Sequence, residues 1–289
     1  MTSGSPRKFA RWEVPSVGRL VAIGFLAAVL VWIAAPIVYG VLRSFMTEAE
    51  ARELPVHLIP RKFTIENFID VLDAGNLPRA FLNSVIVAAL QVVLVLLTGS
   101  LAGYVFARKT FLGKDAVFLF VLVTTMVPFS MLLIPLYLTF TQLGLSNTYI
   151  GVVLPGAVSA FSIFLCRQYI LGIPQELFDA ATIDGATDVQ VYTSLVLPLI
   201  RPLLAALSIF VLVDSVNSLL WPLVLLDRPD MLTLTLVLLS YAQGGLIGPD
   251  VTVVLAAAVL ASLPLVVAFI FLQRQFTRGL ALTSGFSGQ

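Results

Sequence analysis

Long apolar runs separated by short polar stretches dominate the pattern of this sequence. The first run, Leu20–Leu42, is 23 residues long without a charge, and about 20 apolar residues are enough for a helix to cross a bilayer. A secretory signal would carry an apolar core of only ~7–15 residues, so we expect this run to be a retained span. The pattern predicts an all-α membrane protein with six transmembrane helices, at Leu20–Leu42, Phe81–Ala107, Ala116–Leu143, Ile150–Cys166, Pro202–Leu226 and Val251–Leu272.

The six runs define one membrane domain between two tails. We expect residues 1–19 to form a basic N-terminal tail, residues 20–273 the six-span domain and residues 274–289 a C-terminal tail. A long polar segment, Arg43–Arg79, joins the first two spans and holds five basic and six acidic residues.

Several residues interrupt the apolar runs. Pro128 and Pro135 in the third run and Pro264 in the sixth leave backbone carbonyls unpaired, so we expect bends there. Asp214 and Asn217 lie three residues apart in the fifth run and therefore share a helix face. A carboxylate inside a span costs roughly 2.5–3.5 kcal/mol on insertion scales, so it should face protein or water. The two residues are candidates for lining a translocation pathway, and a role in helix packing is an equal alternative.

Basic residues are distributed unevenly between the two sides of the predicted membrane domain. With the N-terminus inside, six of the 17 basic residues lie outside, and five of those six belong to the segment Arg43–Arg79. The short external loops hold only Arg228, which agrees with the positive-inside rule. We therefore expect both termini and the segment at 172–200 in the cytoplasm. The predicted cytoplasmic basic residues are Arg7, Lys8, Arg11, Arg19, Arg108, Lys109, Lys114, Arg167, Arg201, Arg274 and Arg278.

Composition narrows the possible functions. The 289 residues are 59% hydrophobic and 11% charged, with net charge +1 and mean hydropathy +1.01, so nothing indicates nucleic acid as a partner. The single cysteine, Cys166, is expected to be a buried thiol, and the single histidine, His57, has no partners at metal-site spacing. The chain has no Walker loop and no H-E-x-x-H motif, and only Asp214 is a spanning aspartate. We expect no catalytic residue, no metal site and no enzymatic activity.

One polar cassette, Pro174–Pro198, stands between the fourth and fifth runs. Pro174 suits the first position of a short helix, and Gly185 suits its end because glycine adopts left-handed geometry freely. Thr187 and Gln190 have the spacing of a capping box, which predicts a second helix ending at Pro198. The first helix should present one face that includes small residues, made of Leu177, Ala180, Ala181 and Asp184.

The cassette resembles the EAA loop of ABC importer membrane subunits. That loop reads E-A-A, three residues, Gly, nine residues and I-x-L-P, and here Asp179-Ala180-Ala181, Gly185 and Leu195–Pro198 occupy these places. The I-D-G-A at Ile183–Ala186 is typical of the carbohydrate-uptake subfamily that includes the maltose permeases. Asp179 replaces the usual Glu and Leu195 the usual Ile, while the spacing is intact.

Other segments are similar to the same permease family. Glu66–Leu72 with Phe81–Ser84 resembles its external segment and second-span entry, and Val216–Leu223 resembles its W-N-x-x-x-W-P-L pattern. Gln273–Leu280 is similar to its Q-R-x-F-x-x-G-L ending, whereas Thr283–Gln289 departs from the usual terminus.

The resemblance implies a type I ABC importer permease fold, with a cytoplasmic coupling helix within the loop at 172–200 that sits in a groove of an ATPase subunit. It further implies a second permease subunit, two ATPase subunits that bind ATP and Mg, and an external binding protein. No cofactor is expected in this chain. The cargo would be a carbohydrate or related polyol, imported across a bacterial cytoplasmic membrane by alternating access. The implied coupling residues are Glu176, Asp179, Ala180, Ala181, Asp184 and Gly185.

Two alternatives remain open at this point. An ATP-independent secondary transporter or facilitator would require the cassette to be a mere connecting loop, and a structural membrane scaffold is a further possibility. The sequence does not select among disaccharide, oligosaccharide, amino-sugar and glycerol-phosphate cargo.

Overall fold

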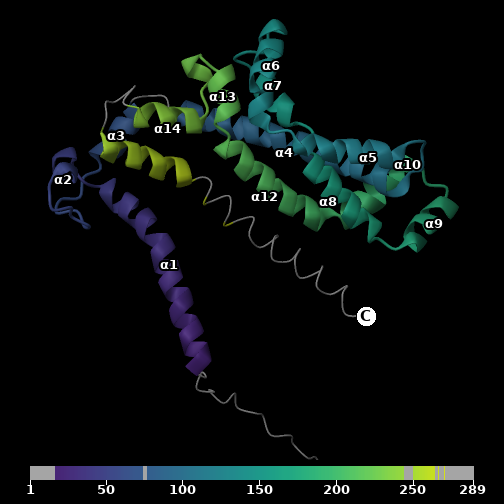
Figure 1. Cartoon of the computed structure of the whole chain (residues 1–289), viewed down its shortest axis with the longest axis horizontal. Coiled ribbons are helices and arrows are strands. Elements are labelled where there is room, and N and C mark those ends of the chain that lie inside the picture. The colour runs from purple at the N-terminus through teal and green to yellow at the C-terminus, as the bar shows by residue number, and fades with distance from the viewer. Residues whose placement is uncertain (1–16, 74–76, 244–249, 264–265, 267–269, 271–289) are drawn as a thin grey trace, which may run out of the picture.

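A computed structural model describes residues 17–73, 77–243, 250–263, 266 and 270, and these residues form helices and connecting turns without a strand. Two straight helices are long and apolar enough to cross a membrane, α1 (Val17–Arg43) and α4 (Leu77–Arg108). Both begin three or four residues before the predicted spans and end one residue after them. At 1.5 Å per residue α4 is roughly 48 Å long. Figure 1 shows it running from the end where α3 and α14 lie to the end where α9 and α10 lie.

Helix α1 stands apart from the other helices (Figure 1). Its side chains are apolar and exposed over most of its length. At its end the Arg43 guanidinium donates to the Tyr39 hydroxyl at 2.8 Å and to the Ala51 carbonyl at 2.7 Å. The polar segment that follows is therefore folded against the end of α1.

That segment contains two short helices, α2 (Glu48–Arg52) and α3 (Glu66–Asp73). The buried Asn67 amide donates to the carbonyls of Ser44 and Met46, both at 2.8 Å. The Thr252 hydroxyl donates to the side-chain oxygen (Oδ1) of Asn67 at 3.2 Å. One asparagine thus joins the turn after α1 to the helix at Val251–Leu263, which belongs to the predicted sixth span.

Three further apolar segments are bent pairs of helices, with bends of 97°, 51° and 75° in chain order. With α1, α4 and Val251–Leu263 they make six apolar segments among the described residues, the number predicted. The bent pairs comprise α5 (Lys114–Val123), η1 (Thr124–Met126) and α6 (Phe129–Gln142); α7 (Tyr149–Val153), η2 (Leu154–Gly156) and α8 (Ala160–Leu171); and α10 (Asp188–Gln190), η3 (Val191–Val196), α11 (Leu197–Leu199) and α12 (Arg201–Asn217).

The third apolar segment is broken at the first of its two prolines. Pro128 caps α6 with an extended backbone after the 97° bend, as predicted. Pro135 lies inside α6, and the helix continues through it. Pro264 lies outside the described residues.

The fourth segment is longer than predicted. Helix α8 continues past Arg167 to Leu171, because the Arg167 side chain turns back onto the protein. Its guanidinium lies 4.3 Å from the Phe118 ring centre, and its Nε donates to the Phe106 carbonyl at 3.3 Å. A charge with these partners does not have to end a span.

The fifth predicted span, Pro202–Leu226, is not continuous. Helix α12 ends at Asn217 and a separate helix, α13 (Leu220–Leu225), follows. Pro222 has no N–H to donate to the preceding turn. The Trp221 indole donates to the Gly151 carbonyl at 3.0 Å and holds α13 against α7. The segment predicted as an external loop then contains η4 (Pro229–Met231) and α14 (Leu234–Ala242).

Helices α4 and α8 approach closely at two glycines. A Cβ added to Gly99 would lie 2.9 Å from the Ser162 Cβ, and one added to Gly103 would lie 2.5 Å from the Cys166 Cβ. Small residues at such positions let membrane helices pack backbone to backbone. Cys166 is buried at this contact, as predicted. This tight pair carries the cassette that follows α8.

Candidate functional site: the cassette and a polar cavity

The cassette (residues 172–200) begins with α9 (Gln175–Ile183). Pro174 has an extended backbone and is the N-cap, so it lies one position earlier than predicted. Gly185 has φ +74° and follows the end of the helix, as predicted. The Gly185 N–H donates to the Thr182 carbonyl at 3.1 Å, and the Ala186 N–H donates to the Ala181 carbonyl at 3.0 Å. These two bonds are a Schellman motif, which fixes the turn through the backbone.

The second limb of the cassette starts at the predicted capping box. The Thr187 hydroxyl accepts from the Gln190 N–H at 3.3 Å, while the Gln190 side chain accepts from the Thr187 N–H at 2.7 Å. A π-helical stretch follows, and its Tyr192 hydroxyl lies 2.7 Å from the buried Ser100 hydroxyl of α4. Pro198 does not end this limb, since the helix continues to Leu199 before the 75° bend.

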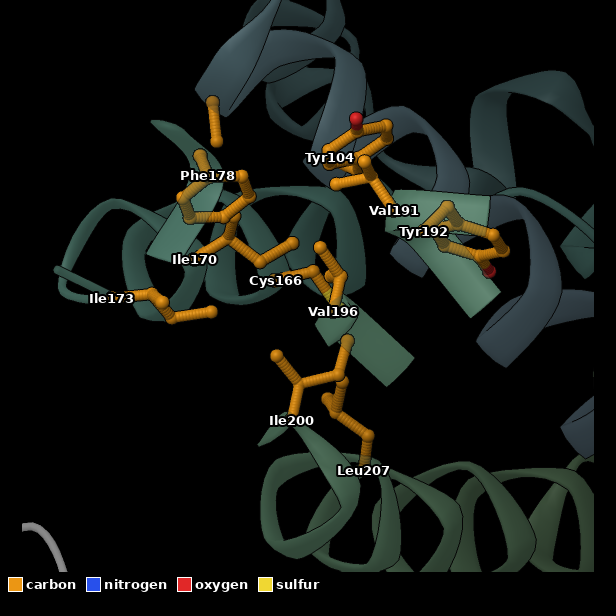
Figure 2. Close-up of a cluster of buried hydrophobic side chains, with 11 residues drawn as sticks. Tyr104, Cys166, Ile170, Ile173, Phe178, Val191, Tyr192, Val196, Ile200 and Leu207 are labelled. Carbon is orange, nitrogen blue, oxygen red and sulfur yellow. The ribbon is translucent and has the colours of Figure 1, made fainter. Parts of the chain in front are cut away.

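A buried apolar cluster holds both limbs in place. Figure 2 shows Phe178 of α9 beside Ile170 and Ile173, with Val191, Tyr192 and Val196 of the second limb on the same cluster. Phe178 is only 7% exposed. Because buried side chains in both limbs contact the same helices, we expect the cassette to be a rigid projection rather than a flexible loop.

Most of the predicted coupling residues lie on the exposed surface of the cassette. Ala181 is the exception, because it is half-buried against the apolar cluster. The Asp179 carboxylate accepts from the Gln175 amide at 2.9 Å within the same helix. The structure thus brings these residues together on one projection. The exposed members are Glu176, Asp179, Ala180, Asp184 and Gly185.

Two exposed apolar residues were missed by the sequence prediction. Ile183 is 86% exposed at the end of α9, and Val189 is 70% exposed at the start of the second limb. An isoleucine beside Asp184 and Gly185 in an otherwise polar turn is the signal that could have identified the first. Exposed apolar side chains flanking a rigid turn are suited to burial against a protein surface.

A cavity of about 580 Å³ lies toward the opposite end of α4. Asp214 and Asn217 both line it, so the structure places the predicted pathway residues on one wall. The Asn217 amide donates to the Val213 carbonyl of its own helix at 2.9 Å. The Thr233 hydroxyl is buried without a hydrogen-bond partner in the described part of the chain. The lining residues are Ser84, Val87, Gln91, Phe129, Val152, Pro155, Gly156, Asp214, Ser215, Asn217, Ser218, Leu219, Leu220, Trp221, Pro222 and Thr233.

The cavity wall contains one carboxylate, Asp214, and no lysine or arginine. No ion pair joins Asp214 to another described residue. Residues of the described chain form no cluster that could hold a metal ion, and the His57 ring lies 3.6 Å from the Glu53 carboxylate. The arrangement offers hydroxyl, amide and carboxylate groups to a polar molecule.

Comparison with known proteins gives consistent matches. The family described as "Binding-protein-dependent transport system inner membrane component" matches residues 95–282. The chain is 39% identical to the "Arabinooligosaccharides transport system permease protein AraQ" of Halalkalibacterium halodurans, over 93% of this chain and 96% of that protein. It is also 39% identical to the "Lactose transport system permease protein LacG" of Rhizobium radiobacter, over 74% and 78% of the two chains.

A solved structure shares the fold. A chain from a bacterial ABC transporter involved in the import of the acidic polysaccharide alginate superposes with a TM-score of 0.79 at 24% identity. The match covers 94% of this chain and 100% of that chain. The bent and broken helices therefore belong to an architecture found in an ABC transporter.

Proposed function

The chain belongs to the family of binding-protein-dependent transport system inner membrane components and is a permease subunit of an ABC importer, and from this premise we propose that it carries an uncharged carbohydrate and that the ATPase drives its movement by pushing on the cassette. It is a transporter subunit and not an enzyme. Membership of the family implies a partner permease, an ATPase and a substrate-binding protein, together with a location in the inner membrane.

In the proposed assembly two ATPase subunits bind ATP and Mg, and this chain binds no cofactor. The cassette faces the cytoplasm, as does each terminus. The positive-inside distribution supports this orientation, because Arg108 and Lys109 contact the cassette. Closure of the ATPase dimer would push both permease subunits from the inward-open to the outward-open state, and the external binding protein would deliver the cargo.

The observation that carries the coupling role is the rigid, exposed tip of the cassette. Its turn is fixed by the Schellman motif, and Ile183 and Val189 present apolar surface on either side of Gly185. Glu176, Asp179 and Asp184 add exposed carboxylates to the same cassette. A groove with an apolar floor and basic or polar rims fits such a tip.

The cavity supports an uncharged cargo. Lactose and arabinooligosaccharides, named for the two relatives, are uncharged sugars rich in hydroxyl groups. The Gln91 amide and the unpaired Thr233 hydroxyl suit such groups, whereas the Asp214 carboxylate would repel a phosphate or uronate. The alginate importer shares the fold alone, so its acidic cargo does not transfer to this chain.

Family membership argues against an ATP-independent secondary transporter. That alternative leaves the capped turn and its two exposed apolar residues without a purpose. It also predicts uptake in vesicles without ATP.

The coupling role is tested by a cross-link in the assembled importer. Cys166 is buried and is replaced by Ala, and a single cysteine is placed at Ile183. Ile183 is a better position than Ala181, which is half-buried. We expect a nucleotide-sensitive cross-link to a cysteine in the groove of the ATPase subunit.

The matched control is Leu112→Cys. Leu112 is fully exposed in the short loop between α4 and α5, at the same end of α4 as the cassette but outside it. It should give no comparable cross-link. Equal cross-linking from both positions, or none from Ile183, would contradict the coupling role.

A further inference from the structure

We propose that Arg108, the last residue of α4, is a positioning residue that fastens the first limb of the cassette to α4. The proposal rests on the coupling role of the cassette. It assigns the transmission of movement to one side chain that contacts neither cargo nor ATPase. The consequence is that the cassette and the wall of the cavity are joined through α4.

The Arg108 guanidinium contacts three consecutive parts of the chain. Its Nη2 donates to the Ile170 carbonyl in the last turn of α8 at 2.7 Å, and also to the carbonyl of Ile173 between α8 and α9. Its Nη1 donates to the Gln175 side-chain oxygen of α9 at 2.7 Å. Its central carbon (Cζ) lies over the Phe178 ring, 4.0 Å from the ring centre. One half-buried cation thus contacts four partners, on the last turn of α8, on the turn that follows it and on α9.

The chemistry of these partners requires arginine. The last carbonyls of a helix carry the negative end of the helix dipole, so a cation there is favourable, and the Ile170 carbonyl accepts the guanidinium in addition to the Ile173 N–H. A guanidinium offers five donors in a plane and stacks on aromatic rings, whereas an ammonium group is a single point of charge. Lysine at this position could not hold Ile170, Ile173 and Gln175 while stacking on Phe178.

The neighbouring Lys109 makes a weaker contact with the second limb. Its ammonium group pairs with the Asp188 carboxylate at the start of α10, and both side chains are substantially exposed. The hydrogen bond to Asp188 raises the pKa of Lys109 above its ordinary value. Exposed pairs of this kind contribute little. Lys109 is therefore a matched control, since it is an adjacent cation that contacts the same cassette.

Helix α4 connects this anchor to the cavity without a break. Ser84, Val87 and Gln91 line the cavity at one part of α4, and Arg108 is its last residue. Gly99 and Gly103 between them hold α8 in backbone contact. A displacement of the cassette would therefore be delivered to the cavity wall. Without Arg108, α9 could shift on the apolar cluster while α4 stayed behind.

The test compares Arg108→Gln, Arg108→Lys and Lys109→Gln in the full importer, reconstituted in proteoliposomes with its binding protein. The readout is the number of ATP molecules hydrolysed for each cargo molecule imported, which a purely structural role would leave unchanged. For Arg108→Gln we expect a rise of about 10-fold, since several charge-assisted hydrogen bonds are lost. Arg108→Lys should be intermediate, and Lys109→Gln should change the ratio by less than about 2-fold.

A wild-type ratio in Arg108→Gln, or equal ratios in Arg108→Gln and Lys109→Gln, would overturn the proposal. If Arg108→Gln does not assemble, Phe178→Leu removes the ring under the guanidinium while keeping an apolar side chain in the buried cluster, and it should raise the ratio in the same direction. An unchanged ratio in that variant would count equally against the proposal. The Ile183 cross-link separates the two hypotheses. If the cross-link forms and the ratio of ATP to cargo is unchanged in Arg108→Gln, the positioning role of Arg108 is wrong. If the cross-link does not form, the coupling role of the cassette is wrong.

Discussion

The turn of the cassette and the wall of the cavity, at different places along α4, are held by different kinds of hydrogen bond. The turn of the cassette is closed by hydrogen bonds between near neighbours, such as Gly185 to Thr182 and Thr187 to Gln190. The wall of the cavity depends on distant partners, since the Leu234 N–H donates to the hydroxyl of Ser84, which lines the cavity, at 2.8 Å.

This difference indicates that the two regions have different mechanical roles during transport. A tip that must fit a partner's groove keeps its shape through local caps, which persist while the surrounding helices move. A cavity that opens and closes is bounded by long-range contacts, which can be exchanged when one helix moves against another. The account therefore predicts that variants in the two regions have separable effects.

The largest effect is expected where both regions depend on the same contact. Gly103→Leu would place a side chain 2.5 Å from the Cys166 Cβ and 2.9 Å from the Arg167 nitrogen, so α4 and α8 would have to separate. Overpacking of this kind costs about 1–3 kcal/mol or more. We expect severe loss of assembled complex, measured by the yield and thermal stability of the purified importer. Gly24→Leu on the exposed α1, where an added Cβ meets nothing within 4 Å, should assemble normally.

The second effect concerns the cassette alone. Gly185→Leu places a side chain at φ +74°, which costs roughly 1–2 kcal/mol, although its Cβ meets no described atom within 4 Å. We expect assembly to survive and cargo uptake to fall by about 10-fold. Gly185→Asn should retain most of the uptake, because asparagine tolerates left-handed geometry. Equal losses in the two variants would show that backbone strain is not the cause.

The smallest effect on uptake is expected in the cavity. Asp214→Asn keeps the size of the side chain and removes its charge, so uptake of an uncharged cargo should change by less than about 3-fold. Asp214→Lys should allow an anionic sugar to compete with the uncharged cargo, because the repulsion becomes attraction. Competition assays at matched expression measure both effects. If Asp214→Lys leaves the competition by anionic sugars unchanged, Asp214 does not select the cargo.

The difference between local and long-range contacts also explains what could be predicted from the sequence. The turn at Gly185 and the capping box at Thr187 were predicted correctly, because each depends on residues within a few positions, whereas the burial of Ala181 depends on the distant apolar cluster. The number of apolar segments followed from composition. The break after Asn217 was missed, because the Trp221 bond to the Gly151 carbonyl joins residues 70 positions apart. The continuation of α8 past Arg167 was missed for the same reason, since its partners Phe106 and Phe118 belong to other helices.

The residues of the candidate site could likewise be predicted only where they are close together in the sequence. The shared face of Asp214 and Asn217 was predicted from their spacing, whereas their neighbours Gln91 and Thr233 come from other elements. Arg108 was predicted from the charge distribution only as one of the cytoplasmic basic residues. Its contacts with α8 and α9 became visible only when the chain was folded.

The most direct test is the ratio of ATP hydrolysed to cargo imported, measured in the same proteoliposomes for Gly185→Leu and Asp214→Asn. The account predicts that Gly185→Leu raises this ratio by about 10-fold at an unchanged preference among sugars. Asp214→Asn should leave the ratio unchanged. A normal ratio in Gly185→Leu, together with a raised ratio in Asp214→Asn, would contradict the assignment of coupling to the cassette.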